Sequence, residues 1–173
     1  MSFARPPRPP HPLATMLSLR RYRLFISHAW DYTGEYEAAV NLLNTDFFFQ
    51  WDNLSVPEET PLMTLPLLPR SYRYLVRQID ERILQADCLL VLAGMYVAHS
   101  GWIQSEMEAA REFRKPIIAV RPRGNERFPE AAMLIANETV WWNTASIVSA
   151  IRRNVSDAPA PPIPPSRLRG PFG

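Results

Sequence analysis

The 173-residue sequence has little cysteine, glycine or histidine. Cys88 is the one cysteine, so no disulfide can form within the chain. Three histidines and one thiol give few ligands for a metal, and no metal site is predicted. None of the six glycines has the spacing of a Rossmann G-x-G-x-x-G turn or of a phosphate-binding P-loop. The sequence therefore argues against Rossmann-type dinucleotide binding, P-loop phosphoryl transfer and metal chemistry.

Long apolar runs are also absent. No N-terminal stretch has the apolar core of a signal peptide, and no run approaches the length of a membrane span. Together with the single cysteine, this predicts a cytoplasmic protein with no membrane partner.

Acidic residues are missing from the first 23 residues, which makes the charge uneven. Segments 1–23 and 152–173 carry a net charge of +8, so the body between them carries −6 within a total of +2. An acidic body argues against a nucleic-acid-binding face on the folded part.

Proline is abundant at both ends of the chain. Of the 18 prolines, five fall in the first 12 residues and six between Pro159 and Pro171. We therefore expect a disordered Pro/Arg-rich tail over 1–21, one domain over 22–155 and a second disordered tail over 156–173.

Apolar periodicity predicts five strands that alternate with five helices. The expected strands are Tyr22–Ser27, Phe47–Trp51, Cys88–Ala93, Ile117–Val120 and Thr139–Trp142. The expected helices are Glu35–Leu43, Tyr72–Ala86, one that Ser100 caps and Pro116 ends, Ala131–Ala136 and Asn143–Val155. Four prolines make residues 52–69 a long loop. Cys88, at the start of a buried strand, is expected to be inert core.

This alternation predicts a three-layer α/β domain with a doubly wound sheet of five parallel strands, in the order 2-1-3-4-5. Strands one and three are then neighbours where the winding reverses, and ligands bind beyond their carboxyl ends. The loop 28–34 and the turn 94–101 should flank this crevice, with the proline-rich loop as a lid. A response-regulator receiver domain would need an aspartate after strand three, where Gly94 and Met95 stand, and a lysine after strand five, whereas Lys115 is the one lysine of the sequence. The sequence therefore argues against a receiver domain. A phosphate loop at Thr33 and Gly34 has weak support.

Glu106 differs from the other two acids of its predicted helix. Glu108 precedes Arg111 by three residues, as Glu112 precedes Lys115. Such pairs are typical of a solvated, ion-paired helix face. Glu106 instead shares a face with Trp102, Ala109 and Phe113. Glu106 is either an ordinary surface residue or part of a functional site, and its expected position at the edge of the crevice favours the functional site.

Four segments in order carry a family resemblance. They are FISHAWDY at 25–32, W-x-N-x-S-V-P at 51–57, AGMY with S-x-W-I-x-x-E within 93–106, and KPII-x-V-x-P-x-G at 115–124. This set resembles the TIR-like domain family of the Thoeris antiphage protein ThsB, over about residues 22–155. The resemblance implies a flavodoxin-like fold. It also implies that NAD+ is a substrate, with no bound cofactor, and that its nicotinamide–ribose bond is cleaved after a phage-derived trigger. The product would be an ADP-ribose-derived, often cyclic, nucleotide that activates a separate effector; a homo-oligomer is a further expectation.

The catalytic glutamate of the wider TIR family follows a W-x-x-x-E pattern, which Trp102 to Glu106 match. The resemblance therefore assigns Glu106 as catalytic. A carboxylate can stabilise the oxocarbenium-like sugar that forms when nicotinamide departs, and a neutral leaving group needs no acid. Many catalytic TIR domains carry arginines just after strand one, whereas His28 and Trp30 stand here.

The candidate substrate-binding residues come from the same segments. They are Ser27, His28, Ala29, Trp30, Asp31, Tyr32, Asn53, Ser55, Tyr96, His99, Ser100 and Trp102. Each also has a structural interpretation: the tryptophans could be core aromatics, the histidines polar loop residues, and Asn53 and Ser55 could only shape their loop. The whole domain could likewise be a catalytically silent TIR-type interaction module.

Overall fold

The fold of this chain comes from a computed structural model, which describes residues 20–27, 33–56, 69–92, 100–121 and 130–155. The strands are β1 (Arg21–Ser27), β2 (Gln50–Asn53), β3 (Cys88–Leu92), β4 (Ile117–Val120) and β5 (Glu138–Val140). The helices are α2 (Thr33–Asn44), α3 (Pro69–Gln85), α5 (Ser100–Glu112), α6 (Glu130–Ile135) and α7 (Thr144–Asn154).

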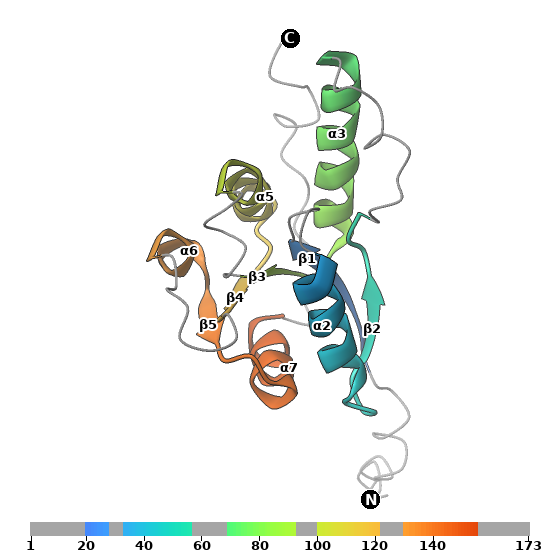
Figure 1. The fold of residues 1–173 in the computed structure, drawn as a ribbon, viewed down its shortest axis with the longest axis vertical. Coiled ribbons are helices and arrows are strands. Elements are labelled where there is room, and N and C mark those ends of the chain that lie inside the picture. The colour runs from blue at the N-terminus through green and yellow to red at the C-terminus, as the bar shows by residue number, and fades with distance from the viewer. Residues whose placement is uncertain (1–19, 28–32, 57–68, 93–99, 122–129, 156–173) are drawn as a thin grey trace, which may run out of the picture.

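The five strands form one parallel sheet in the order β2-β1-β3-β4-β5, which confirms the predicted topology. Helices α3, α5 and α6 cover one face of this sheet, and α2 and α7 cover the other (Figure 1). The winding therefore reverses between β1 and β3, where Ser27 lies in register with Val91.

The middle of the sheet forms the core because helices exclude water from both of its faces. Every residue of β3 and of β4 is buried, as expected for continuous apolar runs in a parallel sheet. Above them, α3 contributes Leu75, Ile79 and Ile83, which lie on one stripe at a spacing of four residues. Cys88 is fully buried, as predicted, and burial raises the pKa of its thiol, so it is inert core.

The start of β2 differs from the prediction, because a turn occupies part of the expected strand. The Asp46 carboxylate accepts a hydrogen bond from the Phe48 backbone N–H at 2.9 Å, and the Asp46 carbonyl accepts one from the Phe49 N–H at 3.0 Å. Phe47 is consequently 83% exposed, whereas Phe49 is buried and stacks on Tyr22. The assignment of residues 47–49 to a strand is wrong, since local hydrogen bonds to Asp46 compete with the sheet.

Lys115 is buried, at 9% exposure, and not part of a solvated helix face. The end of α5 explains this. Arg114 has a left-handed φ of 54°, its N–H donates to the Arg111 carbonyl at 3.0 Å, and the Lys115 N–H donates to the Ala110 carbonyl at 2.8 Å. This is a Schellman cap, which turns the chain back onto the protein. Burial lowers the pKa of Lys115, against an opposing effect of Asp87.

The predicted tails, the proposed lid after β2 and the two crevice loops lie mostly or wholly outside the described residues. Within the part that is described, no helix is both long enough and apolar enough to cross a lipid bilayer.

Candidate functional site

The site begins with Ser27 and Glu106, which are 79 positions apart in sequence and meet in the fold. Ser27 is the last residue of β1, and Glu106 lies in the second turn of α5. The Ser27 hydroxyl donates a hydrogen bond to Glu106 Oε2. Both side chains are withdrawn from solvent: Ser27 is 0% exposed and Glu106 is 4% exposed. The acid that the sequence singled out therefore lies beside the carboxyl end of β1.

Burial makes Glu106 unusual among helical glutamates. A buried carboxylate is costly unless hydrogen bonds satisfy it, and the Ser27 hydroxyl supplies one such bond. Glu106 also borders a small pocket of about 10 Å³, which is enough for roughly one water molecule. Val76, Ile79, Asp80 and Ser105 line the rest of this pocket, so α3 forms its opposite wall.

Asp80 is a residue that the sequence analysis missed, because it belonged to the polar face of its predicted helix. The structure places Asp80 at the same pocket as Glu106, so two acidic residues line one hollow. A signal was present in the sequence: Asp80 follows Val76 by four residues and therefore lies at the edge of the apolar stripe.

Asn53 is the last residue of β2 and Ser55 lies two residues beyond it, and the described hydrogen bonds of both residues join parts of the protein to one another. Ser55 Oγ accepts from the Ile26 backbone N–H at 2.8 Å, and the Ser55 N–H donates to Asn53 Oδ1 at 3.0 Å. Asn53 Nδ2 in turn donates to the Tyr36 hydroxyl at 2.7 Å. These contacts hold the end of β2 against β1 and α2. A role of Asn53 or Ser55 in substrate binding stays a prediction.

The side chains of the other candidate residues are outside the described part of the structure. His28, Ala29, Trp30, Asp31, Tyr32, Tyr96 and His99 lie outside the described residues. Ser100 and Trp102 lie in the first turn of α5, but their side chains are outside the described set. Of the predicted site, the structure thus brings Ser27 and Glu106 together.

The family model for the TIR-like domain of the Thoeris protein ThsB matches residues 25–127, which include both Ser27 and Glu106. The chain belongs to this family. Its predicted membership is confirmed, and curated proteins give no match.

Two solved structures resemble this TIR-like domain in fold. The CMP N-glycosidase BcmB of Clostridium botulinum is 13% identical, covers 75% of this chain and 98% of its own, and has a TM-score of 0.44. An NADH:FMN oxidoreductase, EMOB, in its apo form, is 14% identical, covers 86% of this chain and 99% of its own, and has a TM-score of 0.45.

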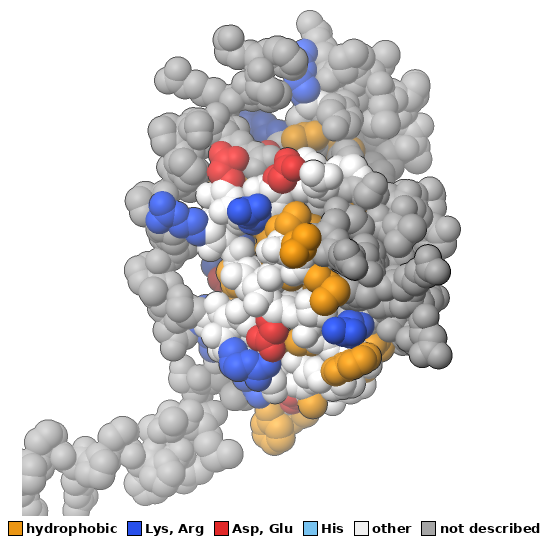
Figure 2. Space-filling model, turned by 90° about the vertical axis from the view of Figure 1, so that its left-hand side faces the viewer, with side chains coloured by type: hydrophobic (Ala, Val, Ile, Leu, Met, Phe, Trp, Pro, Cys, Tyr) orange, Lys and Arg blue, Asp and Glu red, His pale blue; other side chains and the backbone are white. Residues whose placement is uncertain are grey.

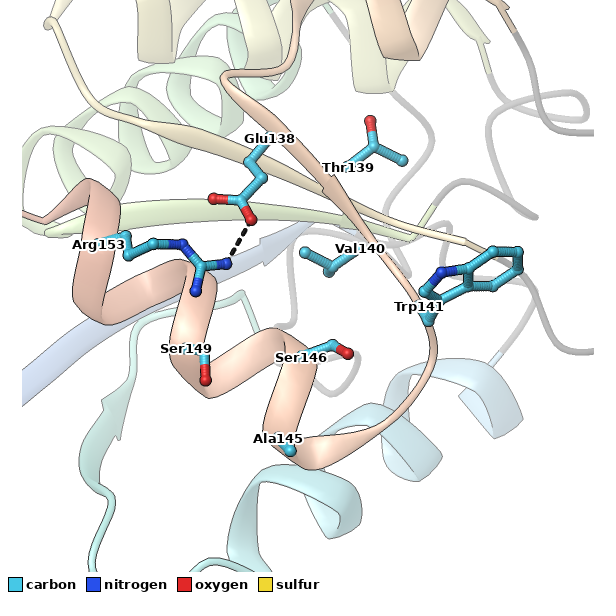
Figure 3. Close-up of a pocket in the computed structure, with 8 residues that line it drawn as sticks. All are labelled: Glu138, Thr139, Val140, Trp141, Ala145, Ser146, Ser149 and Arg153. Atoms are coloured by element: carbon cyan, nitrogen blue, oxygen red, sulfur yellow. Dashed lines mark hydrogen bonds and ion pairs between the residues drawn. The ribbon is translucent and has the colours of Figure 1, made fainter.

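A larger hollow of the TIR-like domain lies away from Glu106, between β5 and α7 (Figure 3). It is an open groove of about 430 Å³, lined by Glu138, Thr139, Val140, Trp141, Ala145, Ser146, Ser149 and Arg153. Arg153 points at Glu138 and pairs with it, and this hydrogen bond lowers the pKa of Glu138. The groove holds none of the predicted site residues, and its main charges are already paired with each other.

The side of the TIR-like domain that carries α5 and α6 has a mixed surface (Figure 2). Among the described residues on this side, apolar side chains lie next to acidic and basic ones. Among the described residues, Trp141 is 65% exposed, and the Arg121 guanidinium lies 4.5 Å from the centre of its ring.

Proposed function

We propose that this TIR-like domain cleaves the nicotinamide–ribose bond of NAD+ with Glu106 as the catalytic residue. One observation carries the proposal: Glu106 is a buried carboxylate at the carboxyl end of β1, at the point where the sheet reverses. Ligands of doubly wound folds bind at such points. Membership of the ThsB TIR-like family and the W-x-x-x-E pattern from Trp102 to Glu106 support the same assignment.

Cleavage of the nicotinamide–ribose bond is favoured by a fixed carboxylate. As the bond to nicotinamide breaks, positive charge develops on the ribose, and a carboxylate held in place stabilises that charge. Nicotinamide leaves as a neutral molecule from a cationic pyridinium, so no acid is needed for its departure. A carboxylate that is already desolvated and oriented does not have to be reorganised during the reaction.

The proposal extends to the biological output. The ADP-ribose-derived product, which we expect to be cyclic, would activate a separate effector in response to a phage-derived trigger. NAD+ serves as the substrate, and the reaction needs no other cofactor. We expect the active form to be a homo-oligomer that acts without a nucleic acid or a membrane as partner.

Glu106→Gln is the decisive variant, and Glu108→Gln is its matched control on the same helix. Glu106 is buried, whereas Glu108 is exposed and accepts a hydrogen bond from Gln104. The full chain is incubated with NAD+ and an extract of phage-infected cells as the source of the trigger, and mass spectrometry follows nicotinamide. We expect Glu106→Gln to lower turnover by about a hundredfold to a thousandfold. Glu108→Gln should retain the activity of the wild type.

Mass spectrometry of the same samples identifies the nucleotide product. If the triggered wild-type protein releases no nicotinamide, the proposal fails and the silent interaction module becomes the better account. If Glu106→Gln and Glu108→Gln are equally active, the activity is real but its assignment to Glu106 is wrong.

A further inference from the structure

Ser27 is a residue of the sheet, and its side chain directly contacts the candidate catalytic carboxylate. It is the last residue of β1, it lies in register with Val91 of β3, and it is completely buried. Its hydroxyl donates to Glu106 Oε2. A strand between two neighbours cannot shift easily, so this hydroxyl is a fixed point for a side chain that comes from a helix.

We propose that Ser27 is a positioning residue for Glu106, which holds the carboxylate in one orientation and favours its ionised form. This inference rests on the proposed function and deepens it. A hydrogen bond donated to a carboxylate stabilises the charged state relative to the neutral one, and the effect is large where water is excluded. Ser27 acts through Glu106, and no contact between Ser27 and the substrate is required.

Ser55 provides an internal comparison, because it is a second buried serine at the same end of the sheet. Its Oγ accepts a hydrogen bond from the Ile26 N–H, one residue before Ser27. Removal of either hydroxyl therefore breaks a buried hydrogen bond next to the end of β1, but only the Ser27 bond ends on Glu106 in the described contacts. Asp80 of α3 is the described charged group that shares the small pocket with Glu106, and it is unchanged in both variants.

The experiment compares the full-length wild type with Ser27→Ala, Ser27→Thr and Ser55→Ala. Nicotinamide release in the presence of the trigger is measured as kcat and KM across a pH range. We expect Ser27→Ala to lower kcat by about tenfold with little change in KM, as for the loss of a hydrogen bond to a charged group. Its acid limb should move to higher pH. Ser27→Thr keeps the hydroxyl and should restore both properties.

A second readout needs no catalysis. In protein with ¹³C-labelled glutamate carboxyls, the Glu106 signal is identified by its absence from Glu106→Gln, and its titration is followed by NMR. The titration midpoint of Glu106 should move to higher pH in Ser27→Ala. In Ser55→Ala it should stay at the wild-type position, although that variant also loses a buried hydrogen bond.

The inference is overturned if Glu106 titrates identically in Ser27→Ala and the wild type. This holds whether or not the protein cleaves NAD+. Absence of nicotinamide release from the triggered wild type would instead count against the proposed function and leave the NMR result to decide about Ser27. Should Ser27→Ala not fold, Ser27→Cys offers a side chain of similar size and a weaker donor, and the same shift in the Glu106 titration is expected.

Discussion

Replacement of Asp87 by alanine should show how strongly β1 is tied to the start of β3. The Asp87 carboxylate accepts from the Arg23 backbone N–H at 2.8 Å and from the Arg23 guanidinium at 2.8 Å. The Asp87 N–H donates to the Arg23 carbonyl at 2.7 Å. Asp87→Ala removes both side-chain contacts and leaves the last one in place.

The expected cost follows from the exposure of the two partners. Hydrogen bonds to charged groups contribute about 1.5–3 kcal/mol each, but solvent screens pairs at the surface. The Asp87 side chain is 14% exposed, whereas that of Arg23 is 50% exposed, so the guanidinium contact is worth less than the full value. The contact to the Arg23 N–H joins β1 to the residue before β3, and the Asp87 carboxylate that accepts it is largely withdrawn from solvent. We therefore expect Asp87→Ala to lower the free energy of unfolding by about 2 kcal/mol at pH 7.

The pH dependence of this loss follows from the pKa of Asp87. Burial acts to raise this pKa, but the hydrogen bonds and the charge of Arg23 outweigh it and hold the pKa of Asp87 below the ordinary value for an aspartate. A group with a lowered pKa stabilises the fold above its unfolded pKa, and that stabilisation disappears as the pH falls through the folded value. The difference between wild type and Asp87→Ala should therefore shrink as the pH falls below about 4.

Urea unfolding followed by tryptophan fluorescence, at several pH values between 7 and 3, measures both expectations. Glu81→Ala is the control, because Glu81 pairs with Arg77 at 2.9 Å on an exposed face of α3. This control should cost about 0.5 kcal/mol or less. The reasoning is refuted if Asp87→Ala costs no more than the control at pH 7, or if its cost is unchanged at low pH.

Three further outcomes are expected. Asn143→Ala should lower the free energy of unfolding by about 1 kcal/mol in urea titrations, because the Asn143 side chain caps α7 through the Ser146 N–H at 2.8 Å; an unchanged midpoint would contradict the cap. In the same assay, Phe49→Ala should lower the free energy of unfolding by about 3–5 kcal/mol, whereas Phe47→Ala should change it by about 0.5 kcal/mol or less. Equal losses would contradict the turn at Asp46, which buries Phe49 and exposes Phe47. Cys88 should resist alkylation in the folded protein and react once urea unfolds it, as mass spectrometry would show; rapid labelling of the native protein would place the thiol at the surface.

Local patterns in the sequence were sufficient for much of the fold. The run Ile117–Val120 was predicted with the bounds that the structure has, because a continuous apolar segment between Pro116 and a second proline allows little else. Asn143 was predicted at the start of the last helix and is its N-cap. The strand order followed from regular alternation and from the handedness of parallel crossovers.

Predictions failed where local hydrogen bonds or an unusual backbone conformation decided the outcome. The aromatic run at 47–49 has strong strand propensity, but hydrogen bonds to Asp46 turn it outward at Phe47. Lys115 looked like the partner of Glu112 on a solvated face, yet the left-handed Arg114 takes it out of the helix. Neither turn contains a glycine, the residue that would have indicated a turn in the sequence.

Periodicity, spacing and short motifs were sufficient to predict the sheet topology, the family and Glu106 as the candidate site acid. The burial of Glu106, its hydrogen bond from the Ser27 hydroxyl and the presence of Asp80 at its pocket depend on the packing of the whole domain. These contacts join β1, α3 and α5, which are far apart in the chain. Their distances depend on how the helices pack on the sheet, and no local pattern encodes that packing.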